Sequence, residues 1–261
     1  MKYALVDNNK TEAAKGLKGV CRICGEPVIP KCGPVKINHW AHKSCTHCDK
    51  WWENETEWHR NWKDLFPKEW QEVVAFDEKT GEKHIADIKT NSGMVIEFQH
   101  SYIKEEERLS REKFYKNMIW VADGTRRKTD YSNFQCVLEY GILWYIPNTV
   151  IFVIEHGLAY FPREWQHCNY PVLFDFKGLI DPKKICNYDQ RRDPLWCLLP
   201  LRDARRGLAV MMMLYRDSFV QYVNDGGFTF KFKEIANTID EAIKNRMIRH
   251  ARISRKLDIY F

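Results

Sequence analysis

The stretch IADIKTNSGMVIEFQHS, residues 85–101, decides which fold the sequence predicts. Two apolar, β-branched runs flank a polar turn that contains Gly93, a pattern typical of an antiparallel hairpin. Asp87 belongs to the first strand, whereas Glu97 and Gln99 lie two residues apart on the second and share a face. An acid inside an apolar run is costly unless a cation or hydrogen bonds satisfy it. The hairpin is therefore either a half-buried sheet with acids on its wet face or a metal site.

The segments around this hairpin predict a mixed α/β order. Residues 51–65 have aromatic and charged side chains at helical spacing, and Pro67 follows the expected helix end. EVVAF, HIADI and MVIEFQ predict three strands of an antiparallel meander. Residues 102–117 predict a second amphipathic helix, and residues 118–123, MIWVAD, a fourth and mostly buried strand. Helix, three strands, helix and strand is the order of an α/β sandwich.

The second half of the chain carries weaker signals. Beyond residue 130 the sequence is aromatic and β-rich, and after RRDPLW it favours helices through RDARRGLAVMMMLYRDSFVQYV and FKEIANTIDEAIKNRMIRHARISRKL. The Pro- and Asp-rich stretch near 181–200 is the best candidate for a domain boundary.

Composition gives mild guidance about partners and location. The 261 residues carry 41 Lys and Arg against 35 Asp and Glu, a net charge of +6, which mildly favours a polyanionic partner. The N-terminus has no apolar signal-peptide core, and the longest apolar runs are shorter than the roughly 20 residues of a membrane span. We therefore expect a soluble, unexported, cytoplasmic protein with no membrane partner.

Nine cysteines in an unexported chain are more typical of metal binding than of disulfides. Four of them lie among apolar residues in the later part of the chain, where buried, inert thiols are expected. The other five precede residue 50. Two C-x₂-C pairs separated by twenty residues predict a tetrahedral and structural Zn²⁺ site. The predicted ligands are Cys21, Cys24, Cys45 and Cys48.

Two histidines near the second pair leave the ligand set open. In KINHWAH, strand alternation puts Trp40 and His42 on one face and His39 on the other, so only one histidine can face a given metal. His42 is the expected substitute ligand, and a histidine packed against the neighbouring helix is the alternative. Cys32 is a spare thiol.

Several ordered motifs resemble one known family. CRICG, HWAH, ETEWH followed by WK, HIADI, IEFQHSYI, the Glu107, Arg111 and Tyr115 helix and MIWV together resemble the CoiA-like competence proteins, a branch of the PD-(D/E)XK nuclease superfamily. The resemblance covers roughly residues 18–122. It implies an α/β, restriction-endonuclease-like core with a small N-terminal zinc module, followed by an α+β C-terminal region.

The resemblance also implies roles for individual residues. The E-S-x-x-H signature falls on Glu55, Thr56 and His59, with Thr in place of Ser. The metal-binding aspartate falls on Asp87. The E-x-Q motif falls on Glu97 and Gln99, where most of the superfamily has Lys in place of Gln.

A hydrolytic mechanism follows as an expectation. Asp87, Glu97 and the Phe98 carbonyl would bind Mg²⁺ or Mn²⁺, which lowers the pKa of a bound water for attack on phosphorus. Glu55 would assist directly or through water, and Gln99 would orient that water without supplying positive charge. A histidine, His59 or His100, is expected to supplement this charge.

The expected organisation therefore has four regions and a nucleic-acid partner. They are a zinc-binding module with an N-terminal strand at 1–50, the nuclease core at 51–125, a β-rich extension at 126–200 and a helical region at 201–261. DNA, with single strands among the candidate substrates, is the expected partner, and the C-terminal region is a candidate protein contact. Expected phosphate contacts are Arg111, Arg249, Arg252 and Lys256.

Two alternatives remain open at this level. One is a non-catalytic zinc-containing adapter that binds nucleic acid and whose acids are vestigial. The other is an HNH-type nuclease built on NHWAH and the cysteine pairs, with catalysis at His42.

Overall fold

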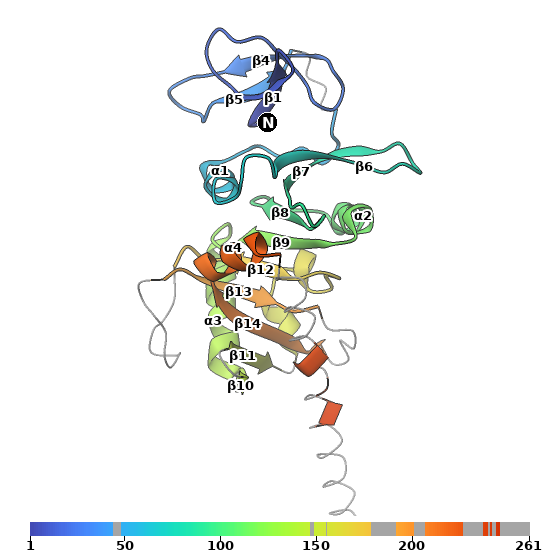
Figure 1. Cartoon of the computed structure of the whole chain (residues 1–261). Coiled ribbons are helices and arrows are strands. Elements are labelled where there is room, and N and C mark those ends of the chain that lie inside the picture. The colour runs from blue at the N-terminus through green and yellow to red at the C-terminus, as the bar shows by residue number, and fades with distance from the viewer. Residues whose placement is uncertain are drawn as a thin grey trace, which may run out of the picture.

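The protein folds as two β-sheets with helices around the larger sheet (Figure 1). The computed structural model describes residues 1–43, 48–146, 149–154, 156–178, 192–200 and 207–226, together with 237–239, 241 and 244–245. A five-stranded sheet is built from the N-terminal residues, and a nine-stranded sheet from the rest of the described chain. The mixed α/β class expected from the sequence is therefore confirmed.

The N-terminal sheet is a small antiparallel unit with the strand order β2-β1-β3-β4-β5. Its core contains few side chains, chiefly Ala4, Val28 and Trp40 beside the thiol of Cys21. So small a core needs an additional staple. The strands are β1 (Tyr3–Val6), β2 (Asn9–Glu12), β3 (Gly19–Val20), β4 (Pro27–Lys31) and β5 (His39–His42).

The large sheet has the order β10-β11-β14-β13-β12-β9-β8-β7-β6 and is continuous from one edge to the other. The meander expected from the sequence is present, because β7 pairs antiparallel with both β6 and β8. The β8, β9 and β12 strands run parallel, so their carboxyl ends meet at one edge. The strands are β6 (Gln71–Phe76), β7 (Lys83–Lys89), β8 (Val95–Gln99), β9 (Met118–Asp123), β10 (Ile142–Ile146), β11 (Thr149–Ile154), β12 (Val172–Asp175), β13 (Pro194–Leu198) and β14 (Ala209–Tyr215).

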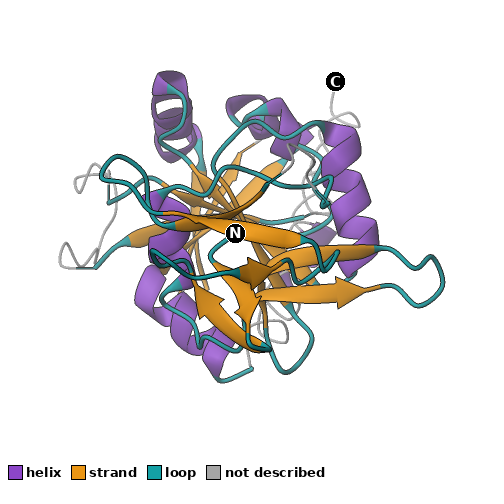
Figure 2. Cartoon of the chain, turned by 90° about the horizontal axis from the view of Figure 1, so that it is seen from above, coloured by secondary structure: helices purple, strands orange, loops and turns teal. Residues whose placement is uncertain are grey.

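Helices cover both faces of this sheet, as Figure 2 shows from above. One face packs Trp62 of α1 and Phe219 of α4 against strand residues such as Phe98. The opposite face packs Phe134 of α3 against Trp196 of β13. The helices are α1 (Glu57–Lys63), α2 (Glu105–Tyr115), α3 (Lys128–Tyr140) and α4 (Arg216–Asn224), with 3₁₀ turns η1 (Gly157–Tyr160) and η2 (Arg163–Trp165).

The first predicted helix is shorter than expected. The sequence pattern suggests a helix from residue 51 to 65, but α1 begins at Glu57. Thr56 caps it: the Thr56 hydroxyl accepts from the His59 backbone N–H, and the His59 ring accepts from the Thr56 backbone N–H. Because this reciprocal box fixes the helix start, Glu55 lies outside the helix.

The β-rich extension expected at residues 126–200 contains β10, β11, β12 and β13, although its first part, residues 128–140, forms α3. One expectation for the second half was wrong. Residues 209–215, placed in a helical stretch, form β14, whose first four residues are buried. Ala, Met and Leu favour helices, but β14 pairs with both β11 and β13, and tertiary pairing outweighs that weak preference. The proposed boundary near 181–200 includes β13, an interior strand of the same sheet.

No helix in the described part of the chain has the length and apolar character of a membrane span.

Candidate metal centre and acidic cavity

A cluster of four metal-binding side chains lies at one end of the N-terminal sheet. The donor atoms of Cys21, Cys24, His42 and Cys48 all lie within 4.8 Å of one another. The two sulfurs of Cys21 and Cys48 are 3.5 Å apart, close to the roughly 3.8 Å expected for two thiolates on a tetrahedral Zn²⁺ with Zn–S bonds of about 2.3 Å. These three thiols and one imidazole could hold a metal such as zinc.

The histidine of this cluster is His42, the expected substitute ligand, and His39 is not part of it. Nε2 of His42 lies 3.4 Å from Sγ of Cys24, while the His39 ring turns back to the Ile37 carbonyl at 2.9 Å. His42 thus completes a set of four in the described chain, as the expected substitute. Cys45, the predicted fourth thiolate, lies outside the described residues.

The N-terminal sheet is fastened to the large sheet through Glu72 of β6. The Glu72 carboxylate accepts hydrogen bonds from the backbone N–H groups of Lys2 and Tyr3, at 2.7 and 3.0 Å. Glu72 has a left-handed backbone (φ 44°), which is unfavourable for a residue with a side chain unless its surroundings hold it. Lys63 supplies a further contact, with its Nζ 2.9 Å from Glu72 Oε1. The metal module and the acidic site therefore share one carboxylate.

Three acids form a row across neighbouring strands. Glu72 faces Asp87, because the β6–β7 register pairs the residues on either side of them. Asp87 in turn lies opposite Glu97 in the continuation of the β7–β8 register. The row runs from β6 through β7 to β8.

The β7–β8 ladder opens at this row, and side chains replace its backbone hydrogen bonds. Paired residues are recorded at Ile88 and Lys89 only. Beyond them, the backbone N–H of Asp87 donates to Glu97 Oε1 at 3.2 Å, and the backbone N–H of Phe98 donates to Asp87 Oδ2 at 3.0 Å. Each carboxylate therefore accepts a hydrogen bond from the backbone of the opposite strand, and both lie where the two strands separate.

The Phe98 carbonyl lies on β8, an interior strand of the large sheet. It is nevertheless near the opening, where Nε2 of His59 lies 3.1 Å from it. Since the Thr56 backbone N–H donates to Nδ1 of His59, the ring proton belongs on Nε2, which donates to the carbonyl. A carbonyl oxygen has a second lone pair, so it can still accept a further contact.

Lys63 is buried in the middle of the acids. Its ammonium lies 2.8 Å from Glu55, 2.9 Å from Glu72 and 3.5 Å from Asp87. Burial alone would lower the pKa of Lys63, but the three carboxylates around it raise that pKa above its usual value. Lys63 is therefore a permanent positive charge within the site.

Arg111 of α2 neutralises the other end of the row. Its guanidinium donates to Glu97 Oε2 at 2.9 Å, to the Trp51 carbonyl at 2.8 Å and to Glu107. Arg111 is 5% exposed, so it faces Glu97 inside the protein rather than a phosphate at the surface. Burial, followed by repulsion from Asp87, raises the pKa of Glu97 to about 8 despite this partner.

The segment from Cys48 to Glu55, which we call the strap, crosses the site between the metal cluster and α1. Asp49 accepts from the Ile85 backbone N–H at 2.9 Å and bonds the His84 ring at 2.8 Å. Glu53 accepts from Gln99 Nε2 at 2.9 Å and from the Ser101 backbone N–H at 2.6 Å. The strap therefore contacts β7 and the end of β8, and it delivers Glu53 and Glu55 to the site.

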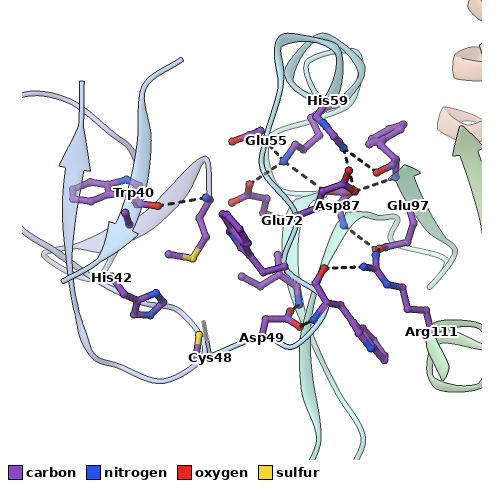
Figure 3. Close-up of a pocket in the computed structure, with 18 residues that line it drawn as sticks. Trp40, His42, Cys48, Asp49, Glu55, His59, Glu72, Asp87, Glu97 and Arg111 are labelled. Carbon is purple, nitrogen blue, oxygen red and sulfur yellow. Dashed lines mark hydrogen bonds and ion pairs between the residues drawn. The ribbon is translucent and has the colours of Figure 1, made fainter. Parts of the chain in front are cut away.

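The acids surround a cavity of about 300 Å³ between the two sheets (Figure 3). Figure 3 shows His42 and Cys48 on one side of it, and Asp87 and Glu97 on the other. Among the predicted site residues, the cavity brings together Glu55, His59, Asp87, Glu97 and Phe98. Gln99 lies beside it and is buried against Glu53. Arg249, Arg252 and Lys256 lie outside the described residues.

Three residues of this site were not singled out from the sequence. Lys63 follows His59 by four residues on one helix face, which was a usable signal. Glu72 lies in the run EVVAF, which predicts an ordinary strand, and Glu53 lies in residues 51–65, which the sequence pattern assigns to a helix. Neither of these two acids has a local pattern that could have identified it.

A second polar cluster lies at the carboxyl ends of the parallel strands. The ring of His100 bonds buried Asp123 at 2.9 Å, and Asp175 accepts from the indoles of Trp58 and Trp62 at 2.9 Å. His100 lies 5.9 Å, ring to ring, from His59.

The protein thus combines a cysteine- and histidine-rich module with an α/β sheet that has a buried acidic cavity. Residues 6–50 match the family model of the competence protein CoiA, N-terminal domain. That match includes all four donors of the metal cluster and ends before the acidic site. The searches of curated proteins and of solved structures returned no match.

Proposed function

We propose that this protein is a Mg²⁺- or Mn²⁺-dependent deoxyribonuclease with a PD-(D/E)XK core at residues 51–125, acting in DNA processing, recombination or defence. One observation carries the proposal: Asp87 and Glu97 lie opposite each other where the β7–β8 ladder opens. Two carboxylates and the nearby Phe98 carbonyl are oxygen donors of the kind that Mg²⁺ and Mn²⁺ prefer. The order α1, β6, β7, β8, α2, β9 is also the helix and strand order that the family resemblance implies.

The residues of the chain have distinct tasks in this proposal. Asp87, Glu97 and the Phe98 carbonyl would hold the ion, which when bound activates water and neutralises charge on the phosphate. Arg111 orients Glu97 through the 2.9 Å hydrogen bond, and Lys63 supplies the positive charge that Gln99 lacks. We assign to Lys63 the supplementary charge that was expected from His59 or His100.

Zinc has a structural part in the same proposal. Four protein ligands leave no open position for a water, so Cys21, Cys24, His42 and Cys48 would stabilise the small N-terminal sheet. The sheet then holds Glu72 and one end of the strap in place. Catalysis at His42, the HNH alternative, is disfavoured because that ring lies within the thiol cluster.

One observation favours the non-catalytic adapter as a second candidate. Lys63 and Arg111 already neutralise the acids, as expected for a purely structural ion-pair network. Calorimetric titration of zinc-loaded protein with Mn²⁺ separates the two. The nuclease proposal predicts binding that Glu97→Ala abolishes and that Glu78→Ala, in the exposed β6–β7 turn, leaves intact. Wild-type protein that binds no Mn²⁺ would favour the adapter.

A further inference from the structure

The buried amide of Gln99 has one end paired and the other end free. Its Nε2 donates to Glu53 Oε2 at 2.9 Å and to the Ser101 carbonyl at 3.2 Å. Gln99 is only 4% exposed, and its Oε1 is buried. This oxygen nevertheless has no hydrogen-bond partner among the described residues. Buried acceptors are rarely left unpaired. Oε1 is therefore the polar atom of this side chain that lacks a donor among the described residues.

Glu53 determines which end of the amide is free. An ionised carboxylate is only an acceptor, and so is the Ser101 carbonyl. Rotating the Gln99 amide by half a turn would place Oε1 against both of these acceptors. The NH₂ group is thus held toward Glu53, and the oxygen is held away from it.

Glu53 is itself held in place and ionised. Its Oε1 accepts from the Ser101 backbone N–H at 2.6 Å, while its Oε2 accepts from Gln99. Burial alone would raise the pKa of Glu53, but the nearby His59 ring and hydrogen bonds from Ser101 bring it below its usual value. The strap on which Glu53 lies is anchored by Asp49 on β7 and by the Trp51 carbonyl on Arg111.

We propose that Glu53 is a positioning residue of the cleavage reaction: its carboxylate fixes the Gln99 amide so that Oε1 accepts a hydrogen bond from the attacking water. This inference rests on the proposed nuclease function. In the step itself, the water oxygen bonds to phosphorus and the ester P–O bond breaks. The proton released by the water passes to solvent, and the leaving oxygen takes a proton from solvent. Gln99 orients the water and exchanges no proton.

Glu53→Gln tests this with little change in shape. Glu53 uses its two oxygens for two donors, whereas a glutamine has one oxygen. If that oxygen keeps the Ser101 N–H, the new NH₂ group faces the NH₂ group of Gln99 and forces the Gln99 amide to rotate. We expect kcat for DNA cleavage to fall at least about tenfold, with KM and the calorimetric Mn²⁺ affinity unchanged.

An exchange of the two side chains supplies the rescue. In the double variant Glu53→Gln with Gln99→Glu, residue 53 donates to the carboxylate at 99 and still accepts from Ser101, and residue 99 again presents a free oxygen. We expect it to regain part of the lost kcat, because the carboxylate at 99 then also faces the Ser101 carbonyl, while Gln99→Glu alone, which places two carboxylates together, stays impaired. Glu57→Gln, on the exposed first turn of α1, is the matched control, and thermal unfolding verifies that every variant is folded.

The results of these assays distinguish a failure of the role of Glu53 from a failure of the proposed nuclease function. Wild-type kcat in Glu53→Gln, or a double variant no more active than the single ones, overturns the role of Glu53 alone. A wild-type chain that cleaves no DNA with either ion overturns the proposed function and this inference with it.

Discussion

The Lys63 ammonium lies 3.5 Å from Oδ1 of Asp87 and also contacts two further carboxylates, those of Glu55 and Glu72. A lysine in this position does two things. It neutralises acids that burial would otherwise make costly, and it competes with any cation that Asp87 would bind. Stability without a metal and affinity for a metal are thus opposed at this residue.

Replacing Lys63 should reveal this opposition. Lys63→Met leaves buried carboxylates without their cation, and we expect a loss of about 3–5 kcal/mol in the free energy of unfolding. Mn²⁺ should raise the melting temperature of the variant more than that of the wild type. Lys79→Met, in the exposed β6–β7 turn, is the control. An equal Mn²⁺ response in Lys63→Met and wild type would contradict competition between Lys63 and the ion.

The Glu72 contact predicts a pH-dependent stability. Burial opposes ionisation, but Lys63, the N-terminus and the backbone donors of Lys2 and Tyr3 hold the pKa of Glu72 well below its usual value. A depressed pKa stabilises the fold above the unfolded value of about 4.3, and this stabilisation is lost as pH falls toward the folded pKa. Glu72→Gln should therefore melt below wild type at pH 7, and the difference should shrink below about pH 4. Melting temperatures measured across pH check this; a difference independent of pH would contradict it.

The zinc ligands can be separated by single substitutions. We expect one zinc per chain by elemental analysis, lost in His42→Ala and in Cys24→Ser and retained in Cys45→Ser. Cys32→Ser is the matched control, since Cys32 is not a member of the cluster. If the four cysteines are the ligands instead, zinc should be retained in His42→Ala and lost in Cys45→Ser. Retention of zinc in His42→Ala would therefore return Cys45 to the ligand set.

The start of α1 gives a prediction about local stability. Thr56→Ala removes the side-chain oxygen that caps the helix, which should cost about 1 kcal/mol of unfolding free energy. Thr56→Ser keeps the oxygen and should cost much less. Chemical denaturation of both variants measures the difference. Equal losses would mean that the methyl group, and not the cap, stabilises this turn.

Much of the core around the site was predictable from the sequence because its signals are local. Alternation and the turn at Gly93 predicted the β7–β8 hairpin, and strand parity predicted that only one of His39 and His42 can face the metal cluster. The strand at β14 was not predictable, since Ala, Met and Leu favour helices and only pairing with β11 and β13 makes that segment extended.

The partners of the site residues were harder to predict. The row of Glu72, Asp87 and Glu97 depends on the register of separate strands, which no single segment contains. The contact of Glu53 with Gln99 joins residues 46 positions apart, and the sequence pattern assigns the part of the strap that contains Glu53 to a helix. Long-range pairing of this kind leaves no pattern in a single sequence.

The most direct test of the nuclease assignment is cleavage by Asp87→Ala. Zinc-loaded wild type and variant would be incubated with circular and linear, single- and double-stranded DNA in Mn²⁺ or Mg²⁺, with excess chelator of the divalent ion as a blank and Glu78→Ala as a matched control. We predict cleavage by wild type and by Glu78→Ala, and none above the blank by a folded Asp87→Ala. Equal cleavage by Asp87→Ala, or cleavage that persists in the chelator, would contradict an active site built on Asp87 and Glu97.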